Sequence, residues 1–168
     1  MKTLLVWIAR LFALLIVLGC APSLHASTFD FTFSGTGISV SGSLTATLIS
    51  GNDYLVNSIN GMQNSMAITL LAPGTYGDND NNVFSSGPAL DVHGLGFSIG
   101  STDYNIYYDA SLSAYFECSS AVTNCHAAGD GTQLTSGSLT ATPEPSSLLL
   151  LGTGLLGLGP LIRRFSRI

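Results

Sequence analysis

The stretch that decides the fold is residues 28–48, TFDFTFSGTGISVSGSLTATL. Three phenylalanines alternate with polar residues before a Gly-Thr-Gly turn at residues 35–37, and the alternation resumes after the turn. The apolar positions are Phe29, Phe31, Phe33, Ile38, Val40, Leu44, Ala46 and Leu48, and the polar ones after the turn are Ser39, Ser41, Ser43, Thr45 and Thr47. This period of two predicts an antiparallel hairpin with one buried and one solvated face.

Further strand candidates follow at residues 54–60, 66–71, 94–99, 104–109, 112–118 and 133–142. Glycine, asparagine, aspartate and proline separate them, as at Pro73 and Gly74. No segment has a convincing helical period. We therefore predict an all-β fold, an antiparallel β-sandwich of about eight strands, for the body of the chain at residues 27–142.

The hexapeptide GSLTAT occurs twice in the body, at residues 42–47 and 137–142. Chance can produce such a repeat in a chain so rich in serine and threonine. The alternative hypothesis is that an early strand and the last strand occupy similar sheet environments and could be neighbours. A structure that places the two in different sheets would contradict this hypothesis.

The body carries charge of one sign only. It has no lysine or arginine and nine acids, so its formal charge is −9. The acids are Asp30, Asp53, Asp78, Asp80, Asp91, Asp103, Asp109, Glu117 and Asp130. A surface without cations cannot neutralise phosphates, so we predict no binding of nucleic acid and no docking of the body on anionic lipid. Calcium and polysaccharide remain candidate neighbours.

The N-terminal segment, residues 1–26, has the features of a secretory signal peptide. Lys2 and Arg10 supply positive charge, residues 11–18 form an apolar core, and Ala26 precedes a plausible cleavage site for signal peptidase. An uncleaved anchor is one alternative. Lipoprotein processing before Cys20 is another, because residues 17–20 resemble a lipobox.

The C-terminal segment, residues 143–168, contains an apolar run of 15 residues, 148–162, without a charge. As a helix this run is about 22 Å long, which is short against a hydrocarbon core of roughly 30 Å. A thin span is possible if the arginines that follow it extend to the interface. We predict a short membrane helix, with the C terminus in the cytoplasm and the body outside because of the arginine cluster.

Three features of this segment stand in a fixed order: a Pro-Glu-Pro triplet that ends the last strand, an apolar stretch rich in leucine and glycine, and a terminal arginine cluster. Together they resemble the PEP-CTERM sorting signal, also known as the ice-binding-protein C-terminal type of tag. The resemblance implies recognition by an exosortase in the inner membrane, cleavage near the triplet and outward passage, often in bacteria that make exopolysaccharide. It implies a recognition motif at Pro143, Glu144 and Pro145, a membrane segment at residues 152–160, and a stop-transfer cluster at Arg163, Arg164 and Arg167. A plain C-terminal anchor helix is the alternative.

Two cysteines, Cys118 and Cys125, are close in the sequence of a chain expected in an oxidising compartment. A disulfide between them that braces the loop between two strands is our prediction. Zinc binding together with His93 and His126 is the alternative, which lacks the support of a tight ligand pair.

The acidic run DNDNN at residues 78–82 places Asp78 and Asp80 at alternate positions. This spacing suggests a calcium site, but an EF-hand loop would need glycine at Val83 and glutamate at Ala89. A polar loop of Asx turns is the favoured interpretation, and a weak calcium site at Asp78 and Asp80 is the alternative.

Two matches to enzyme motifs lack the context that each motif needs. Residues 152–157 fit GxGxxG but follow the Pro-Glu-Pro break instead of a strand. Residues 96–100 fit GxSxG, but Ser98 lies in an alternating strand, and Asp91 and His93 precede it in the chain. We therefore predict no catalytic residues, no cofactor and no enzymatic activity.

The hypothesis that unites these observations is an exported protein, sorted by an exosortase to the cell surface or the extracellular matrix, with a non-enzymatic acidic body. A glycan- or calcium-binding module with the same tag is the alternative. An exposed aromatic row on one sheet face would favour glycan binding. The exposed rows of serine and threonine, as at Thr45 and Thr47, suit an ordinary solvated strand face, and a flat hydroxyl face that orders water or ice is the alternative.

Overall fold

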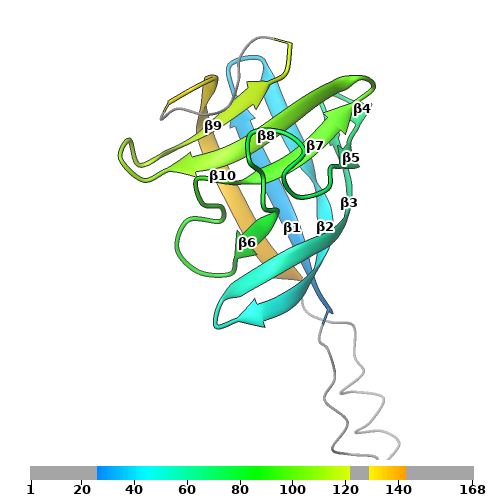
Figure 1. Cartoon of the computed structure of the whole chain (residues 1–168), viewed down its shortest axis with the longest axis vertical. Coiled ribbons are helices and arrows are strands. Elements are labelled where there is room, and N and C mark those ends of the chain that lie inside the picture. The colour runs from blue at the N-terminus through cyan, green and yellow to red at the C-terminus, as the bar shows by residue number, and fades with distance from the viewer. Residues whose placement is uncertain (1–25, 122–128, 143–168) are drawn as a thin grey trace, which may run out of the picture.

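The computed structural model describes residues 26–121 and 129–142, which form ten strands and no helix (Figure 1). The strands are β1 (Ala26–Gly35), β2 (Ile38–Ser50), β3 (Asp53–Gln63), β4 (Met66–Ala67), β5 (Thr69–Leu70), β6 (Asn82–Phe84), β7 (Leu95–Ile99), β8 (Thr102–Asp109), β9 (Ala114–Ser119) and β10 (Thr132–Thr142). The described residues therefore contain no helix that could span a membrane. The predicted C-terminal helix and, apart from Ala26, the predicted signal peptide lie outside the described residues.

All strand pairings are antiparallel, in the order β4-β3-β2-β1-β10-β9-β8-β7-β5, with β6 added to β3. The strands β1, β2 and β3 form one layer, and β7, β8 and β9 cross it as a second layer (Figure 1). β10 joins the layers, because it pairs with β9 at Thr132 and Gln133 and with β1 along the rest of its length. β5 comes near β3, so the sheet nearly closes on itself.

The antiparallel all-β prediction is confirmed, and each of the eight predicted segments coincides with strand structure. The predicted sandwich of separate sheets is replaced by one bent sheet, since β10 continues from one layer into the other. A break in register between Ser34 and Gly35 accompanies this bend, as expected of a bulge. The structure also divides residues 66–71 into β4 and β5 and adds the short strand β6, which the sequence pattern did not predict.

The core lies between the two layers and is built on the phenylalanines of β1. Phe29, Phe31 and Phe33 are at most 2% exposed, and they face Phe97 and Ile106 of the other layer within one buried cluster. Burying such a side chain contributes about 2 to 3 kcal/mol relative to leaving it exposed. Leu48 departs from the predicted pattern and is 44% exposed. It lies beyond Thr47, the last β2 residue that pairs with β1.

The two copies of GSLTAT lie on either side of β1, in β2 and in β10. Gly42 is opposite Phe31, and Gly137 is opposite Phe33. A Cβ atom on Gly137 would lie 2.6 Å from Cδ1 of Phe33, so the glycine makes room for a core phenylalanine. The two copies lie in one sheet, on either side of β1, and are not neighbours of each other. Their environments are only partly similar, because Leu44 and Ala46 are at most 1% exposed, whereas Leu139 is partly buried and Ala141 is exposed.

Candidate functional site

The two ends of the body lie together at one end of the molecule (Figure 1). Thr28, near the start of β1, is paired with Thr142, the last residue of β10. The segment that begins at Pro143 therefore continues directly from a strand bonded to the centre of the sheet. The turn between β1 and β2 lies at the opposite end of β1, so the body has one end next to the C-terminal segment and one end away from it.

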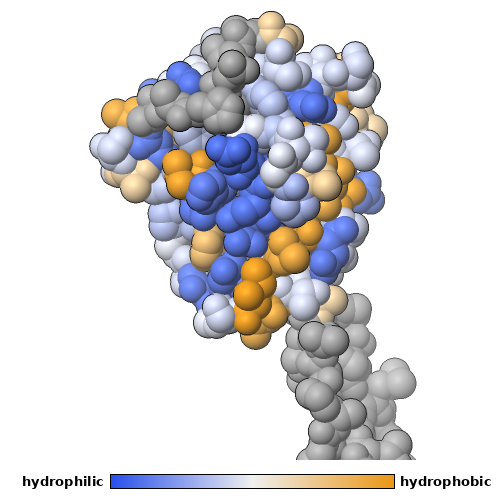
Figure 2. Space-filling model, viewed as in Figure 1, coloured by the Kyte–Doolittle hydropathy of each residue, from blue (hydrophilic) through white to orange (hydrophobic). Residues whose placement is uncertain are grey.

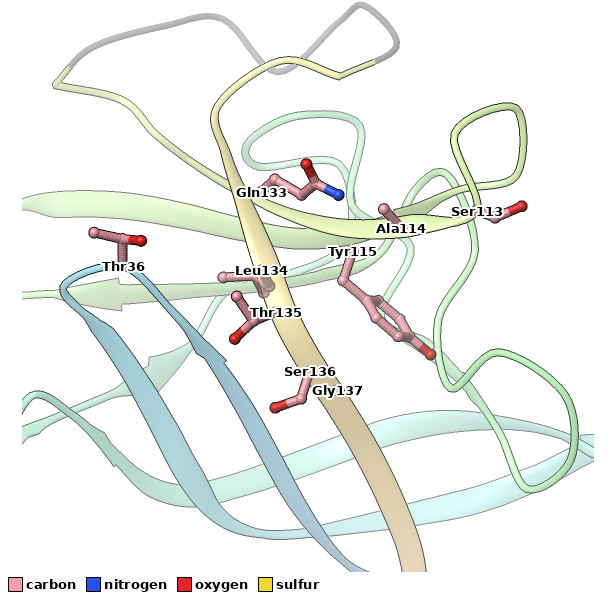
Figure 3. Close-up of a pocket in the computed structure, with 9 residues that line it drawn as sticks. All are labelled: Thr36, Ser113, Ala114, Tyr115, Gln133, Leu134, Thr135, Ser136 and Gly137. Atoms are coloured by element: carbon pink, nitrogen blue, oxygen red, sulfur yellow. The ribbon is translucent and has the colours of Figure 1, made fainter.

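A groove of about 670 Å³ lies where β10 separates from β9 (Figure 3). Figure 3 shows Thr36, in the turn after β1, on one side of β10 and Tyr115 of β9 on the other. The lining residues are Thr36, Ser113, Ala114, Tyr115, Gln133, Leu134, Thr135, Ser136 and Gly137. None of them is charged. The groove can offer hydroxyl groups, an amide and main-chain atoms to a ligand, but no carboxylate or imidazole.

One face of the body has a mixed surface that is not continuously apolar. Figure 2 shows a polar band down the middle of the viewed face with separate apolar patches beside it. The large apolar side chains that are exposed in the described part of the chain are Leu48, Ile49, Met62, Met66, Val92 and Leu112. None of these is aromatic, so the exposed aromatic row that would favour glycan binding is not found among the described residues.

The acidic run at residues 78–82 is held by asparagine amides that point inward. Asn79 and Asn81 are at most 1% exposed, and Nδ2 of Asn79 donates to Oδ1 of Asn81 at 2.8 Å. Oδ1 of Asn79 accepts hydrogen bonds from the main-chain N–H groups of Thr75 and Tyr76. Oδ1 of Asn81 also accepts the N–H of Gly96 in β7 at 2.9 Å. The loop is thereby fastened to the second layer. An Asx turn of the kind predicted occurs at Asp80, whose Oδ1 atom accepts the main-chain N–H of Asn82.

The two candidate calcium ligands, Asp78 and Asp80, are less buried than the asparagines between and after them. Asp78 is exposed and has a positive φ of 52°. Both carboxylate oxygens of Asp80 accept hydrogen bonds from Asn82, one from the main chain and one from the side chain. Partial burial raises the pKa of Asp80 above its ordinary value. In residues 26–121 and 129–142, no group of three or more His, Cys, Asp or Glu residues could hold a metal, so calcium binding stays a prediction without structural support.

Sequence reasoning did not single out Glu117, which is 6% exposed and points into the interior. Nε2 of Gln63, at the end of β3, donates to its Oε1 atom at 2.9 Å. The Oε2 atom of Glu117 and the Oε1 atom of Gln63 have no hydrogen-bond partner within the described part of the chain. Burial raises the pKa of Glu117 to about 7, and the hydrogen bond from Gln63 opposes this increase. In an alternating strand, the neighbour of a buried residue is expected to be exposed. The sequence therefore gave no signal that Glu117 is buried, because the adjacent Phe116 is buried as well.

Some of the residues predicted to form a disulfide, a zinc site or a hydrolase site lie among the described residues, and others do not. Cys118 is 2% exposed and disulfide-bonded. Cys125 and His126 lie outside the described residues, so the pairing of Cys118 with Cys125 stays a prediction. Oδ1 of Asp91 accepts the main-chain N–H groups of His93 and Gly94. Ser98 lies in β7 opposite Asp103, and no hydrogen bond among the described residues joins it to Asp91 or His93.

Comparison with known families identifies the segment that follows β10. Residues 141–167 match the family model of the PEP-CTERM protein-sorting motif. The match includes Pro143, Glu144 and Pro145 and the arginine cluster at Arg163, Arg164 and Arg167, all of which lie outside the described residues. The resemblance to PEP-CTERM proteins is thereby confirmed.

The motif indicates a protein that is exported, targeted to an exosortase and sorted to the cell surface. The chain is thus a protein with a PEP-CTERM sorting motif on an all-β body. No curated protein and no solved structure matches the chain.

Proposed function

We propose that this chain is a non-enzymatic protein of the cell surface or extracellular matrix, held in the inner membrane by its C-terminal segment until an exosortase processes it. The observation that carries the proposal is the match to the sorting motif at residues 141–167, which begins at the last two residues of β10. Signal peptidase would cut after Ala26, exosortase would act near Pro143, Glu144 and Pro145, and Arg163, Arg164 and Arg167 would stop transfer.

The arrangement of the body suits this order of events. Ala26 and Thr142 are the two ends of the described body, and both processing sites would lie beside them at one end of the fold. Cleavage at either site would leave the paired residues of β1 and β10 in place. A body that keeps its fold through both cuts is what a sorted surface protein requires.

The absence of enzymatic activity is part of the proposal and has separate support. The groove beside β10 is lined by no Asp, Glu, His or Lys residue, and burial raises the pKa of its one tyrosine, Tyr115, above the ordinary value. The carboxylate of Asp91 is occupied by the turn that it caps. Glu117 has a pKa of about 7, but it is buried and does not line the groove.

Substitution of Glu144 tests the recognition motif. In cells that contain an exosortase, we expect Glu144→Ala to accumulate as an unprocessed chain in the membrane fraction, while the parent chain is shortened and leaves it. Asp130→Ala is the matched control, because it removes one carboxylate from the body and should be processed like the parent. Equal processing of Glu144→Ala and the parent would contradict the proposed role of the triplet.

Deletion of residues 143–168 tests the anchor. We expect the truncated chain to be exported and recovered in the soluble fraction, because the body has no cations with which to bind anionic lipid. A truncated chain that remains in the membrane fraction would overturn the proposed anchor and would favour lipoprotein processing at Cys20. Radiolabelling with a fatty acid distinguishes this outcome from simple aggregation.

A further inference from the structure

The two copies of GSLTAT differ in how many of their edges are paired. In β2, residues 42–47 pair with β1 on one side and with β3 on the other. In β10, residues 137–142 pair with β1 only. The partner on the other side of β10 is β9, and its pairing is limited to Thr132 and Gln133. From residue 135 to residue 142, one edge of β10 therefore makes no main-chain hydrogen bonds to the described residues.

Within the part of the chain that the structure describes, this free edge has none of the usual protections against strand pairing. Natural sheets protect their edges with short strands, charges, prolines or covering loops. The terminal strands β4 and β5 are two residues long each, which makes them poor templates. The main-chain N–H of Leu71 and the side chain of Asn81 cover part of the edge of β7 by bonding to Gly96. The strand segment formed by residues 135–142 is long, uncharged and without proline.

We propose that the free edge of β10 pairs antiparallel with the same edge of a second copy of this chain. In β2 the equivalent edge of the hexapeptide pairs with the antiparallel strand β1, so the structure itself contains the pairing that β10 lacks. Two identical edges are self-complementary when they are related by a twofold axis. A register centred on Leu139 would place Ser138 opposite Thr140 of the second copy.

The side chains of β10 fit this arrangement on both faces. On the outer face, neighbouring strands already exchange hydroxyl hydrogen bonds, as between Thr32 and Ser138 at 2.8 Å and between Thr45 and Ser58 at 2.7 Å. Pairing Ser138 with Thr140 would continue this series across the axis. On the inner face, Leu139 is only partly buried and Ala141 is exposed. Pairing would bring Leu139 opposite its copy and Ala141 opposite Gly137 of the second copy.

Charge permits contact at this edge although the body carries −9. The acid closest in register is Asp30 of β1, which is paired with Thr140 and so lies one strand behind the edge. In the paired form the two Asp30 residues would be separated by three strand spacings, roughly 14 Å at about 4.8 Å each. This distance exceeds the Debye length of about 8 Å at physiological ionic strength, so their repulsion is largely screened.

The groove beside β10 leaves room for the end of the second strand. It is lined by residues 133–137 of β10 on one side and by Tyr115 and Ser113 on the other (Figure 3). In the register centred on Leu139, Thr142 of the second copy comes opposite Ser136, which lines the groove. The groove is thus the place where the second strand would end, and its uncharged lining matches an uncharged strand.

Cross-linking of cysteine variants tests this pairing in the full chain, solubilised in mild detergent so that the result does not depend on sorting or processing. Thr140→Cys would lie diagonally opposite its copy, about 7 to 8 Å away, within reach of a short bifunctional thiol reagent. Thr45→Cys is the matched control, because Thr45 occupies the same place in the hexapeptide of β2, where both edges are paired. We expect a covalent dimer with Thr140→Cys, and only the level of the parent chain with Thr45→Cys.

A charge substitution tests the same surface without a new thiol. Thr140→Glu would place two like charges diagonally across the strand pair, about 7 to 8 Å apart, and their repulsion should shift the full chain from dimer to monomer in sedimentation analysis. Thr45→Glu adds the same charge to the same outer face and should leave the dimer intact. A parent chain that stays monomeric at all concentrations, equal cross-linking at both cysteines, or a dimer that persists with Thr140→Glu would each overturn the proposal. These outcomes leave the sorting proposal unaffected, since that rests on processing of the tag.

Discussion

β2 and β10 contain the same six residues on either side of one strand, yet their surroundings differ. The copy in β2 is enclosed by main chain on both sides, and the copy in β10 is enclosed on one side. Both glycines lie beside a phenylalanine of β1, so the core requirement is shared. The difference teaches that a local sequence can specify strand, face and packing without specifying how many neighbours the strand has.

The largest expected effect comes from adding a methyl group to each glycine. A Cβ atom on Gly42 would collide with main-chain atoms of Asn60 and Gly61, which cannot move away independently. A Cβ atom on Gly137 would meet the rings of Phe33 and Tyr115, which can shift. We expect Gly42→Ala to lower the free energy of unfolding by about 4 kcal/mol and Gly137→Ala by about 2 kcal/mol. Chemical denaturation measures both, and equal losses would break the distinction between the two copies.

A smaller effect is a dependence of the stability on pH that we expect at the start of β10, where Thr132 pairs with Glu117 of β9. Glu117 has a pKa of about 7 in the folded protein against 4.5 as its ordinary value. The folded state therefore binds the proton more tightly, and stability falls as pH rises from about 4.5 to about 7. We expect Glu117→Gln to remove a decrease of about 2 kcal/mol over this range.

Thermal unfolding at a series of pH values measures this decrease. The control is Asp30→Asn, which removes a carboxylate from an exposed position on β1 and should retain the pH dependence of the parent. If Glu117→Gln and the parent lose the same stability between pH 4.5 and 7, burial of the Glu117 carboxyl group is not the cause.

The smallest effect should be the same on both sides of β1. Thr45 shares a hydroxyl hydrogen bond with Ser58, and Ser138 shares one with Thr32, both on the exposed outer face. Thr45→Val and Ser138→Ala should each cost about 0.5 kcal/mol, because water can replace the lost partner. Denaturation measurements should give two similar values, and a cost above about 2 kcal/mol at either position would indicate a role beyond cross-strand pairing.

The strand pattern could be predicted from the sequence because period-two alternation is a local signal. It identified the hairpin around residues 35–37 and predicted the last strand at residues 133–142, which the structure has as Thr132–Thr142. It did not predict that β10 would join the two layers, because that depends on which strand lies beside it. It also missed β6, since three residues are too few to show a period.

The candidate site was predictable to different degrees in its parts. The sorting motif is a linear signal, and its three elements could be recognised in order. The alternation of Asp78 and Asp80 suggested calcium ligands, so the sequence left a calcium site open beside the favoured polar loop, and it did not show that Asn79 and Asn81 point inward. Burial of Glu117 and the free edge of β10 arise from contacts between distant segments, such as that between Gln63 and Glu117, and had no local signature.

The most direct test of the account is the intact mass of the mature protein recovered from the surface of cells that contain an exosortase. Sorting and processing predict a chain that begins at Ser27, ends near Pro143, Glu144 and Pro145, and lacks Arg163, Arg164 and Arg167. Recovery of the chain only from the inner membrane, with its C terminus still at Ile168, would contradict the account.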